Sequence, residues 1–131
     1  MAAKLTSADR ARIAAAISAA EDGTTGTIAV RVVHQRHVSA HELAKSEFAR
    51  IGMHLHATAN AALVLVAPEA RQFAVIGDSA LHARVGDEFW NQVTLEMRRY
   101  FAYDQLADGI VHAVERVGEQ FHKHFTREPS A

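Results

Sequence analysis

Asn60 and Asp78 are the residues of this 131-residue chain whose types and positions best fit metal or phosphate chemistry. A carboxylate, an amide oxygen and nearby hydroxyl groups are the hard oxygen ligands that Mg²⁺ and Ca²⁺ prefer. Residues 24–27 and Ser79 supply the hydroxyls. The sequence therefore offers Asn60 and Asp78 as candidate ligands of a divalent cation. A simpler role is open for each, and we favour it: Asp78 caps a helix that begins at Ser79, and Asn60 shapes a turn.

Two of the nine histidines lie close to Asn60 in the sequence. His54 and His56 are separated by one residue, a spacing that places both side chains on the same side of an extended segment. They are the candidates for proton transfer beside Asn60. For the histidines as a group we expect a surface role. A zinc site needs several convergent ligands, the chain has no Cys, and it contains no H-E-x-x-H motif.

Other chemistries are excluded by what the chain lacks. Without Cys there are no disulfides and no thiol catalysis. No G-x-S-x-G, P-loop or G-x-G-x-x-G motif occurs. The net charge is -1, so we expect no nonspecific binding of nucleic acid. No apolar run approaches the ~20 residues that span a bilayer, and no signal peptide is visible, so we expect a cytoplasmic protein without a membrane span.

Three segments have the pattern of strands. Residues 27–34 alternate in direction and are rich in β-branched side chains. Residues 61–67 are apolar throughout, which is typical of a central strand covered on both faces. Residues 72–77 follow after a tight connection and are expected to pair antiparallel with residues 61–67.

Helices are predicted before, between and after these strands. The first two begin at Thr6 and Ser39, each a hydroxyl residue followed three positions later by an acid, as in a capping box. The last third of the chain is predicted to hold three helices. The first of them is short and ends at Gly86, and the last is expected to be capped by Asp104.

The resulting order, αβαββααα, predicts an α/β fold: a three-layer α/β/α sandwich around a small mixed sheet of three to four strands. The crossover helix makes the first two strands parallel, and the third runs the other way. The starts of the first two strands and the end of the third therefore lie at one edge, which brings Asn60, Asp78 and residues 24–27 together. We expect one domain over residues 1–131, with a core of about residues 5–125.

Several segments, taken in order, point to a family. They are AEDGTTGTI at residues 20–28, NAALV at 60–64, FAVIGD at 73–78 and VGDEFW at 85–90. They resemble the TPM domain family, in its small soluble bacterial branch. The resemblance extends over about residues 5–125 and depends on the ordered set rather than on any one motif.

The resemblance implies an α/β/α sandwich and, in some members, a weak acid phosphatase that binds a divalent cation, often calcium; other members have no demonstrated activity. Asn60 and Asp78 carry over as the candidate cation ligands. Three positions depart from the family pattern: Thr27 replaces a glutamate, and Ala61 and Ala80 replace glycines. A lost carboxylate weakens cation binding, and added methyl groups restrict close backbone approach. We therefore expect an eroded site.

Two functions from different classes stay open at this point. We favour a noncatalytic interaction module with a protein partner, because it needs no special residues and explains the departures. The alternative is a weak divalent-cation-dependent acid phosphatase acting on phosphomonoesters, in which Asp78 and Asn60 hold Ca²⁺ or Mg²⁺ against a phosphoryl oxygen. The sequence names no substrate, partner or oligomeric state.

Overall fold

The computed structural model describes residues 4–55 and 57–127. The elements within these residues are, in order, α1 (Ser7–Glu21), β1 (Thr27–Val32), α2 (Ala40–Arg50), the 3₁₀ turn η1 (Met53–Leu55), β2 (Ala61–Ala67), the 3₁₀ turn η2 (Pro68–Ala70), β3 (Gln72–Gly77), α3 (Ser79–Ala102) and α4 (Leu106–His124). The α/β class is confirmed, with a three-stranded sheet. The order of elements agrees with the expectation except that α3 takes the place of the two helices expected to meet at Gly86.

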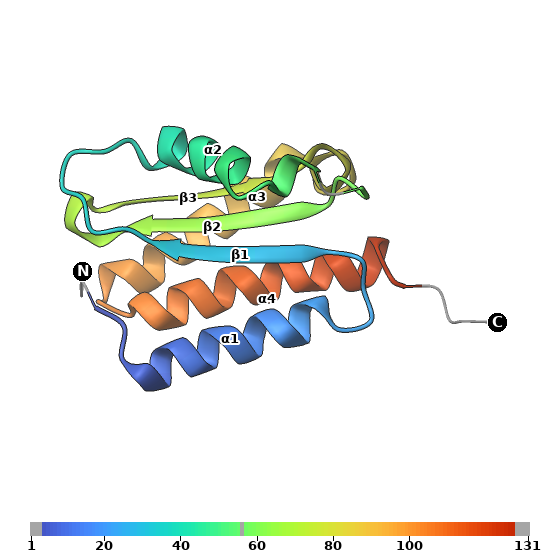
Figure 1. Cartoon of the computed structure of the whole chain (residues 1–131). Helices are drawn as coiled ribbons and strands as arrows, with labels where there is room; N and C mark the ends of the chain where they lie inside the picture. Colours follow the sequence, from blue (N-terminus) through green and yellow to red (C-terminus); the bar gives the residue numbers. More distant parts are fainter. Residues whose placement is uncertain (1–3, 56, 128–131) are drawn as a thin grey trace.

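The sheet has the order β1-β2-β3, with β1 parallel and β3 antiparallel to β2 (Figure 1). Every residue of β2 is buried, so the expectation of a central strand covered on both faces is confirmed. Two separate cores explain why β2 is apolar throughout. Leu63 and Leu65 pack with Ala44 of α2 on one face. Val64 packs on the other face with the buried side chains of α1, α3 and α4, such as Val93.

These two cores make the α/β/α sandwich visible in Figure 1, where α2 lies above the sheet and α1 and α4 lie below it. No helix of the described residues combines the length and the hydropathy needed to cross a membrane. Because helices cover both faces of the sheet, the loops meet at its two ends.

The helix boundaries follow local sequence signals, with one exception. Thr6 and Asp9 form the expected capping box: the Thr6 Oγ1 accepts from the Asp9 N–H, and the Asp9 carboxylate accepts from the Thr6 N–H, both at 3.0 Å. The Ser39 Oγ accepts from the first turn of α2 at 3.3 Å. α3 is broken at Gly86, whose φ of 76° is not helical, at the position where the sequence predicts a helix end.

The prediction that Asp104 caps the last helix is wrong. The capping position of α4 is Gln105, and no side chain fills that role. A capping side chain needs an extended backbone to reach over the first turn. Asp104 instead has a φ of 56°, a left-handed conformation that short polar residues tolerate.

Candidate functional site

The register of the sheet places the starts of β1 and β2 beside the end of β3. Thr27 lies opposite Ala61, and Ala62 lies opposite Gly77. Beyond the last pair, the Asp78 N–H donates to the Ala61 carbonyl at 2.8 Å. We call this place, where the loop residue before β2 and the first residue after β3 meet, the Asn60–Asp78 edge. The topology expected from the sequence thus positions both candidate ligands at one end of the sheet.

Asn60 is fully buried at this edge, and both ends of its side-chain amide are hydrogen-bonded. Its Nδ2 donates to the Thr25 Oγ1 at 2.9 Å, and its Oδ1 accepts from the Thr58 hydroxyl. Thr25 is held in turn by its own N–H, which donates to the Phe125 carbonyl at 2.9 Å. A buried amide satisfied in this way stabilises the loops around it. Asn60 therefore connects the loop before β1 to the loop before β2.

Asp78 is the residue that caps α3, and its two carboxylate oxygens differ. Oδ1 accepts from the Ser79 N–H at 2.8 Å. Oδ2 is buried, and among the described residues it has no hydrogen-bond partner. Buried polar atoms are paired in the great majority of cases, and leaving one unpaired costs free energy. Oδ2 is therefore the atom at this edge that a cation or a proton donor would complement.

Of the two histidines proposed for proton transfer, the structure describes His54 but not His56. His54 lies in η1 and is exposed. In the part of the chain that the structure describes, no hydrogen bond or ion pair joins His54 to Asn60 or Asp78. His56 lies outside the described residues. The geometry thus gives proton transfer at this edge no support from His54.

Backbone hydrogen bonds engage the carbonyl oxygens near Asp78. Ca²⁺ takes about 6–8 oxygen ligands, several of them carboxylates. Here the Ala59 carbonyl accepts from the N–H groups of Ala80 and Leu81, and the Ala61 carbonyl accepts from the Asp78 N–H. Nowhere in residues 4–55 and 57–127 do three His, Asp or Glu side chains gather closely enough to hold a metal ion. Among the described residues at this edge, the Asp78 Oδ2 is the carboxylate oxygen that has no hydrogen bond.

The sequence analysis did not single out two side chains that shape this end of the sheet. The first is Thr58, the partner of Asn60, whose hydroxyl two residues before an amide is a weak local signal. The second is Glu21, whose Oε2 accepts from the Ile28 N–H at 2.8 Å. Because Ile28 belongs to an outer strand of the sheet, this bond satisfies a donor that no neighbouring strand pairs. The hydrogen bonds of both side chains stabilise the loops at this end of the sheet.

The segment after α4 also belongs to this end of the molecule. Thr126 forms an isolated bridge with Thr24, and the Arg127 N–H donates to the Gly23 carbonyl at 2.8 Å. Gly26 lies against the Phe121 ring so closely that a Cβ would overlap it. The loop before β1 is therefore held between the end of α4 and Asn60. The contacting residues of this loop and of the segment after α4 are about a hundred positions apart, so the sequence does not reveal that they meet.

Comparison with protein families gives one match, to the family described as the TPM domain, over residues 1–120. A solution structure of the BA42 protein from the psychrophilic bacterium Bizionia argentinensis superposes with a TM-score of 0.84 at 27% sequence identity. The match covers 93% of this chain and 84% of that one.

A second solved structure shares the fold at lower identity. It is the N-terminal domain of the cg2496 protein from Corynebacterium glutamicum, with a TM-score of 0.71 at 18% identity, covering 90% of this chain and 74% of that one. No curated protein matches the chain.

Proposed function

The chain belongs to the TPM domain family, and within it we propose that this protein is a noncatalytic interaction module that binds a protein partner. The observation that supports this proposal is the state of Asn60. Its amide is fully buried and engaged at both ends, by Thr25 and Thr58. An amide used in this way organises the loops around it, and its two hydrogen bonds hold it in that role.

The surroundings of Asp78 support the same proposal. The nearby carbonyls of Ala59 and Ala61 are used within the fold, and Thr27 stands where the family pattern has a carboxylate. Acid–base catalysis needs a group within hydrogen-bond reach of the reacting atom, directly or through one water. Among the described residues, His54 has no hydrogen bond to Asp78.

Turnover of a chromogenic phosphomonoester tests this proposal. Purified protein is assayed with Mg²⁺ or Ca²⁺, beside the Asp78→Asn variant and the Asp87→Asn variant. Asp87 is a suitable control because its side chain is 89% exposed and it lies on the same helix. We expect no turnover above the uncatalysed rate in any of the three. Turnover in the parent and in Asp87→Asn that is lost in Asp78→Asn would contradict a noncatalytic module.

A second function is favoured by one specific observation, the buried and unpartnered Oδ2 of Asp78. This function is a weak divalent-cation-dependent phosphatase acting on phosphomonoesters. When bound, Ca²⁺ or Mg²⁺ would supply charge for polarising a phosphoryl oxygen, with Asp78 as its carboxylate ligand. Because only one carboxylate oxygen is available as a ligand, the phosphatase is the less favoured of the two functions. A calcium-dependent change in Tm that requires Asp78 would favour the phosphatase over the interaction module.

A further inference from the structure

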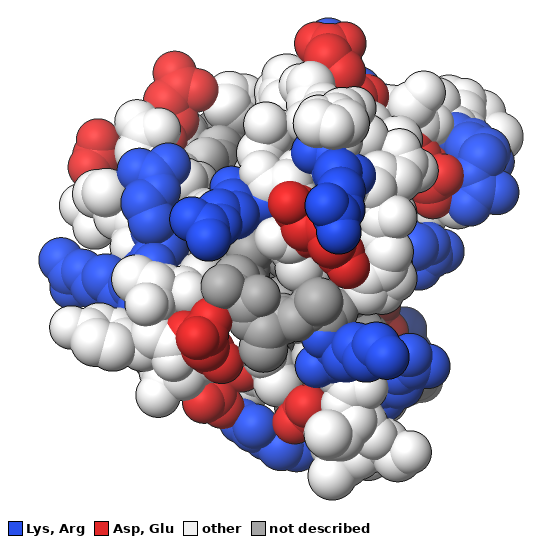
Figure 2. All heavy atoms as spheres, turned by 90° about the vertical axis from the view of Figure 1, so that its left-hand side faces the viewer, with Lys and Arg blue, Asp and Glu red and all other residues white. Residues whose placement is uncertain are grey.

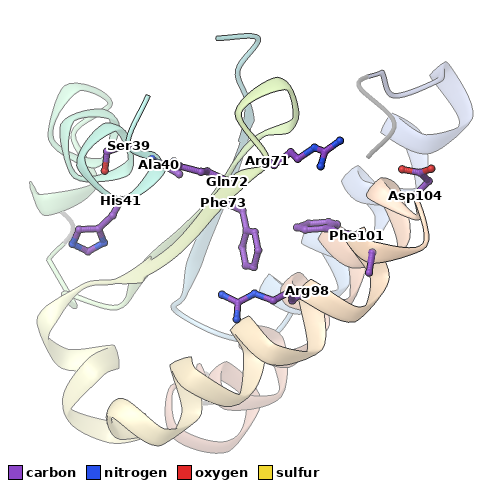
Figure 3. Close-up of a pocket in the computed structure, with 10 residues that line it drawn as sticks. Ser39, Ala40, His41, Arg71, Gln72, Phe73, Arg98, Phe101 and Asp104 are labelled. Carbon is purple, nitrogen blue, oxygen red and sulfur yellow. Dashed lines mark hydrogen bonds between the residues drawn. The ribbon is translucent and has the colours of Figure 1, made fainter. Parts of the chain in front are cut away.

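A pocket of about 670 Å³ lies at the end of the sheet opposite the Asn60–Asp78 edge. It is bordered by the first residues of α2, by Arg71 and the start of β3, and by the last turns of α3 (Figure 3). Gln72 pairs with Ala67 at the end of β2, whereas Gly77 pairs with Ala62 near its start, so the two sites are separated by the length of β2. The volume is within the range of about 300–1,000 Å³ that small-molecule sites occupy.

Two arginines border this pocket without a partner for their charge. Arg71 and Arg98 take part in no hydrogen bond or ion pair of their side chains among the described residues. Arg12 and Arg50 are paired with carboxylates, whereas Arg10, Arg84 and Arg99 resemble Arg71 and Arg98 in having no such partner among the described residues. Asp104 is the one carboxylate among the described lining residues. A planar guanidinium with free donors matches the geometry of a phosphate or carboxylate group.

Two phenylalanines lie between the two arginines. The rings of Phe73 and Phe101 meet edge to face with centroids 5.0 Å apart at 81°. Both residues line the pocket, but Phe101 is only 7% exposed and belongs to the core, whereas Phe73 is half-buried. In Figure 3 Arg71 and Arg98 lie on opposite sides of the pair. A flat apolar group can lie against the exposed part of Phe73 while an attached anion reaches one guanidinium, so the pocket offers both an apolar and a charged contact to an organic anion.

The backbone adds to the positive character of this end. Ser39 and Ala40, at the start of α2, line the pocket, and the N-terminus of a helix carries partial positive charge. The Ala40 N–H donates to the Gln72 Oε1 at 2.8 Å, which fixes α2 against the start of β3. Figure 2 views the molecule from this end and shows Lys and Arg side chains exposed on it, some of them adjoining one another on the left, with Asp and Glu side chains interspersed.

We propose that this pocket binds a small organic anion with a flat apolar body, of the class of aryl phosphates and aromatic carboxylates. The guanidinium group of Arg71 or of Arg98 takes the anionic group, and the half-buried ring of Phe73 contacts the apolar body. This site is separate from the Asn60–Asp78 edge, so the proposal does not depend on the function proposed for that edge.

The test is a titration followed by ¹H–¹⁵N correlation spectra of the labelled full chain. The probes are phenylphosphonate, which no phosphatase hydrolyses, and benzoate. Inorganic phosphate and phenol are the matched controls, since each carries only half of the proposed chemistry. We expect at least one aryl anion to give saturable shifts of pocket signals such as Gln72, Phe73 and Phe101, at a Kd about tenfold or more below those of both controls.

Charge-removing variants locate the binding. Arg98→Gln keeps good helix propensity on the surface of α3, and Arg71→Asn suits the left-handed backbone at that position, where φ is 54°. The variant that removes the guanidinium in contact with the anionic group is expected to raise the Kd of the aryl anion by about tenfold, the effect of losing a charged hydrogen bond, and the other is expected to have a smaller effect. Arg84→Gln, on the other half of α3, is the control and should leave the Kd unchanged.

Three results would overturn the proposal. The first is the absence of saturable shifts with both aryl anions, or shifts that map away from the pocket. The second is binding of inorganic phosphate as tight as that of phenylphosphonate, which would leave the Phe73 ring without a role. The third is an unchanged Kd in Arg71→Asn and Arg98→Gln when their spectra show the parent fold.

Discussion

The Asn60 Nδ2 donates to the Thr25 Oγ1 at 2.9 Å, and this bond joins the loops that lead into two neighbouring parallel strands. The Thr25 N–H donates in turn to the Phe125 carbonyl, which follows α4. One buried amide thus links the loops before β1 and β2, and through Thr25 reaches the end of the last helix. Its importance is structural, and it can be measured as stability.

We expect Asn60→Ala to lower the free energy of unfolding by about 2–3 kcal/mol, because it removes the hydrogen bonds of a fully buried amide to Thr25 and Thr58 and opens a small cavity. Urea unfolding of the parent and the variant measures the difference. Asn91→Ala is the matched control: Asn91 is exposed on α3, and its loss should change the free energy of unfolding by less than about 0.5 kcal/mol. Equal effects of the two substitutions would contradict a structural role for Asn60.

The position of β2 at the centre of two cores predicts a large cost for shortening its side chains. Leu65 is fully buried against α2, so Leu65→Ala should destabilise the protein by about 3 kcal/mol. Leu95 has the same side chain on the surface of α3 and is 50% exposed, so Leu95→Ala should cost less than about 1 kcal/mol. Thermal melts compare them. If the two variants melted together, β2 would not be the covered strand of the sheet.

Glu96 of α3 accepts hydrogen bonds from two residues of α4, His112 at 2.6 Å and Arg116 at 2.9 Å. Burial acts to raise the pKa of the Glu96 carboxyl, but the bonds from His112 and Arg116 outweigh it and hold the pKa below its usual value. A carboxyl whose pKa is lower in the folded state stabilises the fold above its unfolded pKa, about 4.3. That contribution is lost as the pH falls through the folded pKa.

Glu96→Gln should therefore lower the free energy of unfolding by about 1 kcal/mol near neutral pH, and the difference should vanish once the carboxyl is protonated in both states. Urea unfolding over a series of pH values measures it. Glu115→Gln makes the same change at an exposed position on α4 and should show little difference at any pH. A Glu96→Gln penalty that persisted in acid would indicate lost packing rather than a lost charge.

Local patterns in the sequence predicted the elements of this fold well, because the forces that define those elements are local. Seven consecutive apolar residues describe β2, and the glycine at position 86 breaks α3 where its φ of 76° requires it. Asp104 shows the limit. The side chain of an aspartate suits a helix cap. The turn between α3 and α4 gives Asp104 a left-handed backbone, however, and the capping position of α4 is Gln105.

The roles of the candidate site residues could be predicted only in part. Asp78 as a helix cap follows from its position before α3, whereas the burial of its Oδ2 depends on how the loop before β2 folds over it. The engagement of Asn60 depends on Thr25, 35 residues away, and on Phe125 beyond it. The pocket between Arg71 and Arg98 likewise forms only when α2, β3 and α3 have packed.

The last prediction decides whether the unpartnered Oδ2 of Asp78 serves a cation. Ligand binding to the native state alone raises stability by mass action, by about 2.7 kcal/mol at a concentration a hundredfold above Kd. That corresponds to a rise in Tm of about 10 °C for a chain of this size.

Because one unpaired carboxylate oxygen is a poor ligand set, we expect millimolar calcium to change the Tm of the parent by less than about 2 °C at fixed ionic strength. Asp78→Asn should cost less than about 1 kcal/mol, since Asn caps a helix about as well as Asp. Asp87→Asn removes the same charge from an exposed position and controls for general electrostatics. A large calcium-dependent rise in the Tm of the parent and of Asp87→Asn that disappeared in Asp78→Asn would establish a cation site at this edge, and the phosphatase would then replace the interaction module as the better account of the protein.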